Sequence, residues 1–224
     1  LRHADRLKTV GQLAAGLAHE VGTPLNVVAG RASMIMADST MPRDKVCANA
    51  ETIKTEADRI SGIIQKLMDF ARRSPPKMIA GDLNEVVARA AELIGPLARS
   101  KNVHLKTQLP DQPAMATFDF NQMQQVIMNL IDNAVDASPA GGKVSVDLSA
   151  NDRIWMLRVA DQGAGIQTVD QQNIFEPFFT TKDVGAGTGL GLSIAHGIVE
   201  EHGGSIRFES AAEGTTFVVE LPQL

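Results

Sequence analysis

The stretch DFNQMQQVIMNLIDNAVDAS, residues 119–138, decides the fold of the C-terminal two-thirds of the chain. Its apolar residues recur every three or four positions, which predicts a long amphipathic helix. Asp119 stands at its start, where an aspartate or asparagine N-cap is favoured. Asn129 and Asn133 are four residues apart on the flank of the apolar stripe, so they share one face of the predicted helix.

The segments on both sides of this helix alternate between strand and helix patterns. A helix is predicted over residues 82–98 and another near residues 190–202. Strands are predicted over residues 103–109, 143–149, 153–161, 205–210 and 215–221. This mixture predicts an α+β sandwich, with helices on one face of a mixed or mostly antiparallel sheet.

Residues 1–73 follow a different period, because apolar residues there alternate at spacings of three and four in two runs. The polar stretch 38–45 separates the runs and reads as the turn of a helical hairpin. Two such helices bury little alone, so we predict that the hairpin pairs with a second copy in a four-helix bundle. A simple dimerisation coiled coil is the alternative. The linker RRSPPKM ends the hairpin, which divides the chain into predicted domains 1–76 and 77–224.

The composition limits the class of protein. Of 224 residues, 44% are hydrophobic and 21% charged, as in a soluble globular protein. The net charge of −5 and the lack of Lys/Arg-rich runs disfavour nucleic acid as a partner. A single cysteine, Cys47, excludes a disulfide framework within one chain and fits a reducing, cytoplasmic setting. There is no membrane-length apolar run and no signal peptide pattern. The chain starts at Leu1 inside a helical pattern, so we expect a fragment of a longer protein.

The stretch LAHEVGTPLN, residues 17–26, resembles an incomplete metal site. His19 and Glu20 begin the His-Glu-x-x-His pattern of zinc proteases, but Thr23 takes the place of the second histidine. A heptad count places His19 at position f, away from the apolar seam, and Pro24 is expected to bend the helix there. A neutral imidazole is a nucleophile, and an adjacent carboxylate can take its proton or orient its tautomer. An inert surface histidine is the alternative.

Three further motifs suit a nucleotide. The amides of Asn129 and Asn133 suit a hydrated magnesium ion that carries phosphates, although helical asparagines are also ordinary surface residues. In VADQGAGI, Asp161 ends a predicted strand and can accept a hydrogen bond from an exocyclic amine such as that of adenine. Gly163 and Gly165 would let the base approach the backbone. A simple turn explains Asp-x-Gly-x-Gly equally well.

The third motif is FEPFFTTKDVGAGTGLGLS, residues 175–193, in which alternating glycines run into a predicted helix. A helix N-terminus approached by glycines binds phosphate, because its free N–H groups and its dipole point at the anion. Lys182 would add a positive charge. No Gly-Lys-Ser/Thr closes the loop, so it is not a P-loop, and its Gly-x-Gly-x-Gly spacing is not the dinucleotide fingerprint.

Taken in order, HEVGTPLN, NLIDNAVDAS, DQGAGI, FEPFFTTK and GTGLGLS resemble the H, N, G1, F and G2 boxes of bacterial sensor histidine kinases. The resemblance covers nearly the whole chain. It implies a protein-histidine kinase, with a dimeric helical phosphoacceptor domain joined to an ATP-binding α/β sandwich. That sandwich is similar to the one shared by Hsp90, DNA gyrase B and mismatch-repair ATPases.

The resemblance also implies residue roles. His19 matches the autophosphorylated histidine, Glu20 the acidic neighbour that helps deprotonate it, and Thr23 a position that places water for dephosphorylating the partner. Asn133 matches the magnesium ligand, and Asn129 lies near the phosphates. The implied nucleotide-binding positions are Asn129, Asn133, Asp161, Gly163, Gly165, Phe178, Lys182, Gly187, Thr188, Gly189, Leu190 and Gly191.

The implied cofactors are ATP and Mg²⁺, and the implied partners are a second copy of the chain and the receiver domain of a response regulator. The phosphoryl group of His19 would pass to an aspartate of that regulator. A cytoplasmic location is expected, in a full-length protein that can be membrane-anchored. Two alternatives stay open: an enzyme acting mainly as a phosphatase of its regulator through Thr23, and a non-catalytic dimeric scaffold. A chaperone or topoisomerase ATPase is disfavoured because neither explains the helical hairpin.

Overall fold

The chain divides into two units, Leu1–Ser74 with Pro177–Leu190, and Pro75–Glu176 with Gly191–Leu224. A computed structural model describes residues 14–71, 75–151, 153–182 and 189–224.

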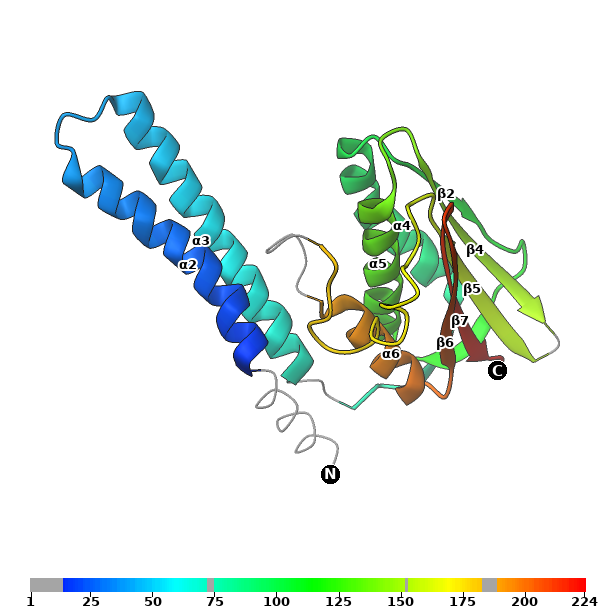
Figure 1. Ribbon diagram of the computed structural model, residues 1–224. Helices are drawn as coiled ribbons and strands as arrows, with labels where there is room; N and C mark the ends of the chain where they lie inside the picture. The colour runs from blue at the N-terminus through cyan, green and yellow to red at the C-terminus, as the bar shows by residue number, and fades with distance from the viewer. Residues whose placement is uncertain (1–13, 72–74, 152, 183–188) are drawn as a thin grey trace. The chain divides into compact units, whose positions relative to one another are not determined.

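The first unit contains the predicted helical hairpin, α2 (Ala14–Ala37) and α3 (Arg43–Ala71) (Figure 1). In the turn, a side-chain oxygen of Asp38 accepts hydrogen bonds from the amide and the hydroxyl of Thr40. The guanidinium of Arg31 donates to the side-chain oxygen of Asn49 at 3.2 Å, which ties α2 to α3. Helix α2 continues through Pro24, which is buried. No helix among the described residues is long and apolar enough to cross a bilayer.

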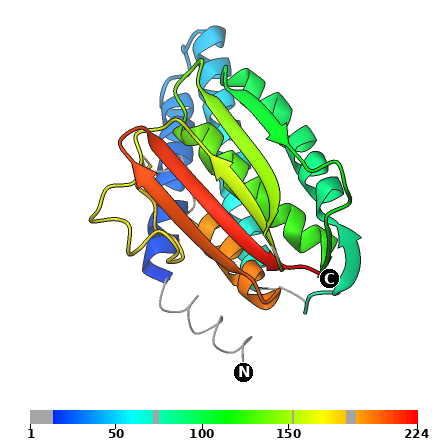
Figure 2. The same ribbon diagram turned by 90° about the vertical axis from the view of Figure 1, so that its right-hand side faces the viewer.

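The second unit is an α/β sandwich, as predicted. Three helices lie on one face of a five-stranded sheet of order β2-β4-β5-β7-β6 (Figures 1 and 2). Among the described strands of this sheet, β2 and β4 are parallel, and the β4–β5, β5–β7 and β6–β7 pairs are antiparallel. The elements of this unit are β1 (Ile79–Asp82), α4 (Leu83–Ser100), β2 (His104–Gln108), β3 (Met115–Phe118), α5 (Phe120–Ala137), β4 (Lys143–Asn151), β5 (Ile154–Ala160), α6 (Gly191–Glu201), β6 (Ser205–Ala211) and β7 (Gly214–Pro222).

Strands β1 and β3 were not predicted. They form a separate antiparallel pair of four residues each, with Ile79 opposite Phe118. Each strand leads directly into a helix whose first turn is capped by an aspartate, Asp82 for α4 and Asp119 for α5. Because the pair is antiparallel, the starts of these two helices lie at opposite ends of it.

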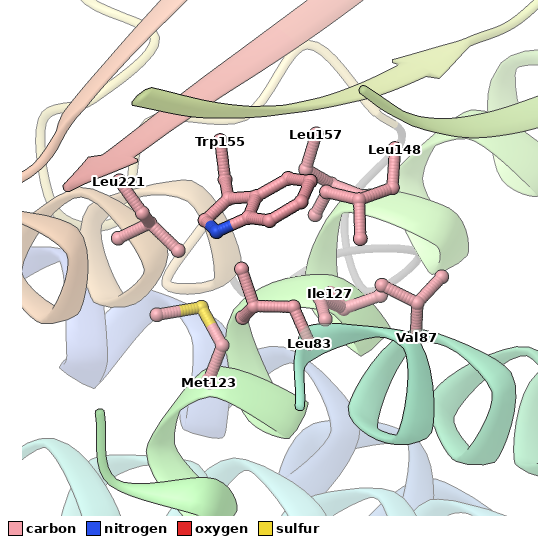
Figure 3. A pocket seen from close by; sticks show the side chains of 8 residues that line it. All are labelled: Leu83, Val87, Met123, Ile127, Leu148, Trp155, Leu157 and Leu221. Carbon is pink, nitrogen blue, oxygen red and sulfur yellow. The ribbon is translucent and has the colours of Figure 1, made fainter. Parts of the chain in front are cut away.

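The core lies between the helices and the sheet. Its side chains come from alternate positions of the strands and from the apolar stripes of the helices, as these two periodicities require. A cavity of about 10 Å³ remains within it (Figure 3). Its lining residues are Leu83, Val87, Met123, Ile127, Leu148, Trp155, Leu157 and Leu221. The indole N–H of Trp155 donates to the main-chain oxygen of Met115 at 2.9 Å, so its polar atom is satisfied.

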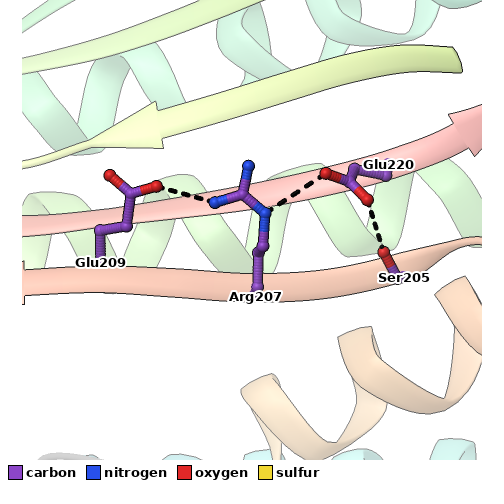
Figure 4. Close-up of polar contacts among 4 residues, drawn as sticks. All are labelled: Ser205, Arg207, Glu209 and Glu220. Carbon is purple, nitrogen blue, oxygen red and sulfur yellow. Dashed lines mark hydrogen bonds and ion pairs between the residues drawn. The ribbon is translucent and has the colours of Figure 1, made fainter.

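The face of the sheet opposite the helices carries exposed charged side chains. On it, Arg207 of β6 donates to Glu209 at 2.7 Å and to Glu220 of β7 at 3.3 Å (Figure 4). Ser205 donates to the second oxygen of Glu220 at 2.9 Å. The hydrogen bonds to Glu209 and Glu220 raise the pKa of Arg207. These exposed contacts suit a solvated face and add little to stability.

Candidate functional site

One flank of α5 organises the candidate site. Asn129, Asn133 and Ala137 follow one another at intervals of four residues, so they lie along one side of the helix. The neighbouring stripe of α5 is buried and contains Val126, Leu130 and Ala134. Packing of that stripe turns the asparagine flank toward the first residue of α6 at one end and the loop after β5 at the other, as the contacts below show.

At the first end, the side-chain amide of Asn129 donates a hydrogen bond to the main-chain oxygen of Gly191 at 3.0 Å. A Cβ atom built at Gly191 would lie 3.8 Å from the Cγ of Asn129 and 3.8 Å from the Nδ2 of Asn133. Both asparagines therefore converge on the start of α6, where the helix dipole places partial positive charge. This arrangement fits a metal-bound phosphate, because a helix N-terminus favours the anion and amide oxygens can bind the accompanying cation.

A magnesium ion with several water and phosphate ligands needs few protein donors, and Asn133 offers one such oxygen. Among the described residues, no group of three or more His, Cys, Asp or Glu side chains is placed to hold a metal. The donor set at this end of α5 therefore suits an ion that arrives with phosphates.

At the second end, Asp161 directly follows β5, as predicted. Its Oδ1 accepts hydrogen bonds from the amides of Gly163 at 2.8 Å and of Thr215 at 3.1 Å. Its own amide donates to the main-chain oxygen of Thr215 at 2.9 Å. Burial raises the pKa of Asp161, and the two accepted hydrogen bonds lower it by less, so the net shift is upward. A half-buried carboxylate held in this way can accept a hydrogen bond from a donor such as an exocyclic amine.

The glycines beside Asp161 are required by close approaches of the backbone. A Cβ at Gly163 would lie 2.6 Å from the main-chain oxygen of Ala137, at the end of the asparagine flank. Gly165 has a φ of +73°, and a Cβ there would lie 2.0 Å from the main-chain oxygen of Ala211. The loop therefore packs between the end of α5 and the β6–β7 turn, with no room for side chains at either glycine.

The sequence did not predict two residues, Ser210 and Thr215, that hold this loop by hydrogen bonds. The hydroxyl of Ser210 accepts from the amide of Ile166 at 2.7 Å and lies 3.0 Å from the hydroxyl of Thr215. Thr215 is buried, and its amide is one of the donors to Asp161. The alternation of β7 carried a signal, since Thr215 falls on the same face as the core residues Phe217 and Val219.

The phenylalanine-rich motif divides between the two units. Phe175 belongs to the second unit. The centroid of its ring lies 5.0 Å from the ring centroid of His196 in α6 and 6.2 Å from that of Phe208 in β6. Phe175 therefore packs between α6 and the sheet. Phe178 belongs to the first unit, where its amide donates to the main-chain oxygen of Gly189 at 3.0 Å. The amide of Lys182 donates to the hydroxyl of Thr180 at 3.2 Å.

Some predicted positions lie outside the described residues or their described side chains. Gly187 and Thr188 are outside the described residues. His19 and Glu20 lie in α2, as predicted, but their side chains are outside the described part of the structure, and so is the predicted outward direction of His19. Thr23 is described and is half-buried on the same helix. Leu190, which directly precedes α6, is buried.

Comparison with protein families finds two matches in chain order. Residues 9–76 match the "His Kinase A (phospho-acceptor) domain", and residues 118–224 match the "Histidine kinase-, DNA gyrase B-, and HSP90-like ATPase" domain. Together these two matches cover most of the chain.

Similar full-length proteins include the sensor histidine kinase ZraS of Escherichia coli, 33% identical over 99% of this chain and 47% of that protein. Sporulation kinase B of Bacillus subtilis is 30% identical over 99% of this chain and 52% of its own length. The chain thus spans about half the length of the curated relatives it matches.

Solved structures agree with these sequence matches. The histidine kinase ThkA in complex with the response regulator protein TrrA aligns with a TM-score of 0.80 and 25% identity, over 99% of this chain and 64% of that one. The separate catalytic domain of ThkA aligns with a TM-score of 0.60 and 31% identity, over 66% of this chain and 98% of that domain.

Proposed function

Because this chain belongs to the sensor histidine kinase family, we propose that it uses ATP to phosphorylate His19 and then phosphorylates a response regulator. Residues 1–76 would form the dimerisation and phosphoacceptor domain, and residues 77–224 the ATP-binding domain. The observation that supports this most is the flank of α5, where Asn129 and Asn133 meet the start of α6 and Ala137 meets the loop of Asp161.

The family match indicates an ATP-binding domain. We assign the following residues to the parts of the nucleotide. Asp161 would accept a hydrogen bond from the exocyclic amine of adenine, beside Gly163 and Gly165. The phosphates would lie at the start of α6, near Gly191 and Asn129. Asn133 would hold a magnesium ion, which offsets the charge of the phosphates when bound. Phe178, Lys182, Gly187, Thr188, Gly189 and Leu190 are proposed to complete the nucleotide site.

The chemistry is a phosphoryl transfer. A ring nitrogen of His19 forms a bond to the γ-phosphorus, the bond from that phosphorus to the oxygen of the ADP leaving group breaks, and Glu20 takes the displaced ring proton. In a second transfer, the N–P bond of phosphohistidine breaks as a carboxylate oxygen of a receiver-domain aspartate bonds to phosphorus. A histidine suits both steps, since it is a good nucleophile and later a good leaving group near neutral pH.

The hairpin supports the proposed homodimer. Its described side chains include exposed apolar residues on both helices, with Leu25 54%, Met34 50% and Ile64 49% exposed. Exposed apolar side chains on both helices of a hairpin favour its association with a second copy, which would remove them from water. The four-helix bundle would supply that burial.

Labelling with [γ-³²P]ATP tests the proposed acceptor. The wild-type chain should take up acid-labile label, and H19Q should take up none while it keeps its affinity for ATP. His104 is exposed on β2, so H104Q is a matched control that should label normally. Label that persists on H19Q would show that His19 is not the acceptor, and a wild-type chain without ATP affinity would favour the scaffold.

The same H box allows a phosphatase. Thr23 lies one helical turn after His19 on α2, where a hydroxyl can place a water against the phosphorylated regulator. Decay of the regulator's phosphoaspartate should be slower with T23A than with wild type, while labelling of His19 is kept. Equal decay would remove this second activity from the proposal.

A further inference from the structure

His202 is buried and uses both of its ring nitrogens. It directly follows α6, with 5% of its surface exposed. Its Nε2 accepts a hydrogen bond from the amide of Asp119 at 2.9 Å, and its Nδ1 lies 2.8 Å from the main-chain oxygen of Ile198. An amide can only donate and a carbonyl can only accept, so Nδ1 carries the proton and the ring is neutral in this arrangement.

Two hydrogen bonds among the described residues join the ends of α5 and α6. The first joins Asp119, the cap of α5, to the end of α6, and the second joins Asn129 to Gly191 at the start of α6. The helices therefore run antiparallel, and the two links are about three turns apart along each helix. The apolar contacts between them are not directional, whereas a hydrogen bond to a fixed atom is. These two hydrogen bonds therefore fix specific atoms of α6 against specific atoms at two points along α5.

The same aspartate also holds the chain that enters the second unit. Its Oδ2 accepts from the amide of Lys77 at 2.8 Å, while its Oδ1 accepts from the amides of Asn121 and Gln122. The Asp119 side chain is consequently held by the segment that precedes β1 and by the first turn of α5. His202 therefore bonds to an anchored amide, and a change at His202 moves α6 rather than α5.

We propose that His202 is a positioning residue of the ATP site. By holding the amide of Asp119, its Nε2 keeps α6 in register on α5, and this keeps Gly191 beside Asn129 and Asn133. The effect on nucleotide rests on the proposed function, because it assumes that phosphates bind at the start of α6.

Three single variants of the complete chain separate positioning from simple stability. In H202Q, the longer amide reaches the place of Nε2 and offers an acceptor to Asp119. In H202N, the shorter amide occupies the place of Nδ1 and leaves Asp119 without its acceptor. H104N is the matched control, since His104 is exposed on β2. ATP affinity, and KM and kcat of autophosphorylation, are measured below the melting transition of each variant.

We expect H202N to raise the Kd and the KM for ATP about fivefold, the loss of one ordinary hydrogen bond, with kcat within about twofold of wild type. H202Q should restore both constants to within about twofold. An H202N chain that binds ATP like wild type, or equal defects in H202Q and H202N, would overturn the inference alone. A wild-type chain that does not bind ATP would overturn the proposed function and this inference together.

A spectroscopic measurement keeps the inference testable even if H202N does not fold. The ring ¹⁵N shifts of His202 in the wild-type chain should be those of a neutral imidazole protonated at Nδ1. Addition of ATP with magnesium should leave that pattern unchanged. A ring protonated at Nε2, in the presence or absence of nucleotide, cannot accept from Asp119 and would rule the positioning role out.

Discussion

The amide of Phe178 donates a hydrogen bond to the main-chain oxygen of Gly189 at 3.0 Å, and both residues have left-handed backbone, with φ of +67° and +61°. Such a conformation costs a non-glycine residue on the order of 1 kcal/mol. The contact joins the phenylalanines of the 175–193 motif to one of its glycines, two residues before α6 begins. Because Phe178 is strained and its amide bonds to Gly189, we expect both residues to be sensitive to substitution.

Gly189→Ala should disrupt this contact. A Cβ at Gly189 would lie 2.3 Å from the carbonyl carbon of Phe178, and its φ of +61° is disfavoured for alanine. We expect ATP affinity to fall at least about tenfold, because displacement of the main chain at this loop alters the proposed phosphate site.

Gly203→Ala is the matched control for Gly189→Ala, since Gly203 has a φ of +71° but nothing within 4 Å of its Cβ position. It isolates the cost of the backbone conformation from that of the clash. Isothermal titration of both variants with ATP and magnesium gives the comparison. Equal affinities in the two variants would show that the approach of Phe178 and Gly189 is unimportant.

Asp161→Asn should stabilise the nucleotide-free protein while weakening ATP binding. Burial raises the pKa of Asp161, so its ionised form is less favourable in the folded chain than in the unfolded chain. Asparagine keeps an oxygen for the amides of Gly163 and Thr215 and removes the charge. Affinity for ATP should fall about tenfold or more, since the acceptor for the adenine amine is altered.

The pH dependence of this gain follows from the sign of the shift. The pKa of Asp161 is higher in the folded chain than in the unfolded chain, so the folded wild-type protein is more stable when Asp161 is protonated. This stability is present at low pH and is lost as the pH rises through the folded pKa. The advantage of D161N over wild type should therefore be largest near neutral pH and shrink on acidification. Thermal melts of both proteins between neutral and acidic pH measure it. A gain that grows on acidification would contradict the upward shift.

Asp119→Ala should destabilise the second unit. Its carboxylate caps α5 and also accepts from the amide of Lys77, so we expect the free energy of unfolding to fall by about 1–2 kcal/mol. D119N keeps a capping oxygen but places an NH₂ group toward Lys77, so its loss should be smaller. Urea denaturation distinguishes them, with the exposed loop residue Asp111→Ala as control.

The charge of Asp119 predicts a second, acid-dependent signature. Burial raises its pKa, but hydrogen bonds from the amides of Lys77, Gln122 and Asn121 together lower it by more, so the net shift of the pKa is downward. The stability from this carboxylate is therefore present above its unfolded pKa and is lost as the pH falls through its lower folded pKa. The difference between wild type and D119A should shrink in acid, and a constant difference would contradict the assignment.

Leu157→Ala should cost about 2–5 kcal/mol of stability, because it enlarges an existing cavity in the core. Leu157 is 3% exposed, whereas Ile154 on the same strand is 39% exposed. Ile154→Ala should cost less than about 1 kcal/mol. Trp155 is the single tryptophan of the chain and lines the same cavity, so its fluorescence reports the unfolding of this unit. Equal decreases in the free energy of unfolding for the two variants would show that Leu157 does not belong to the core.

Much of the second unit could be predicted from local patterns. The period of residues 119–138 predicted α5, and the alternation of apolar residues predicted β4, β5, β6 and β7 within one or two residues of their ends. Asp161 was predicted to end a strand, and β5 ends one residue before it. These features depend on near neighbours in the chain, because periodicity and capping are short-range properties.

The sequence by itself determined the two kinds of domain, the order of the motifs and the face that Asn129 and Asn133 share. Only the tertiary structure decided what that face meets, because Gly191 is 62 residues from Asn129 along the chain. The same reason explains the missed strands β1 and β3, which are stable only as a pair, and the missed roles of Thr215 and His202. Their hydrogen bonds to Asp161 and Asp119 join residues 54 and 83 positions apart, and no local period records such a distance.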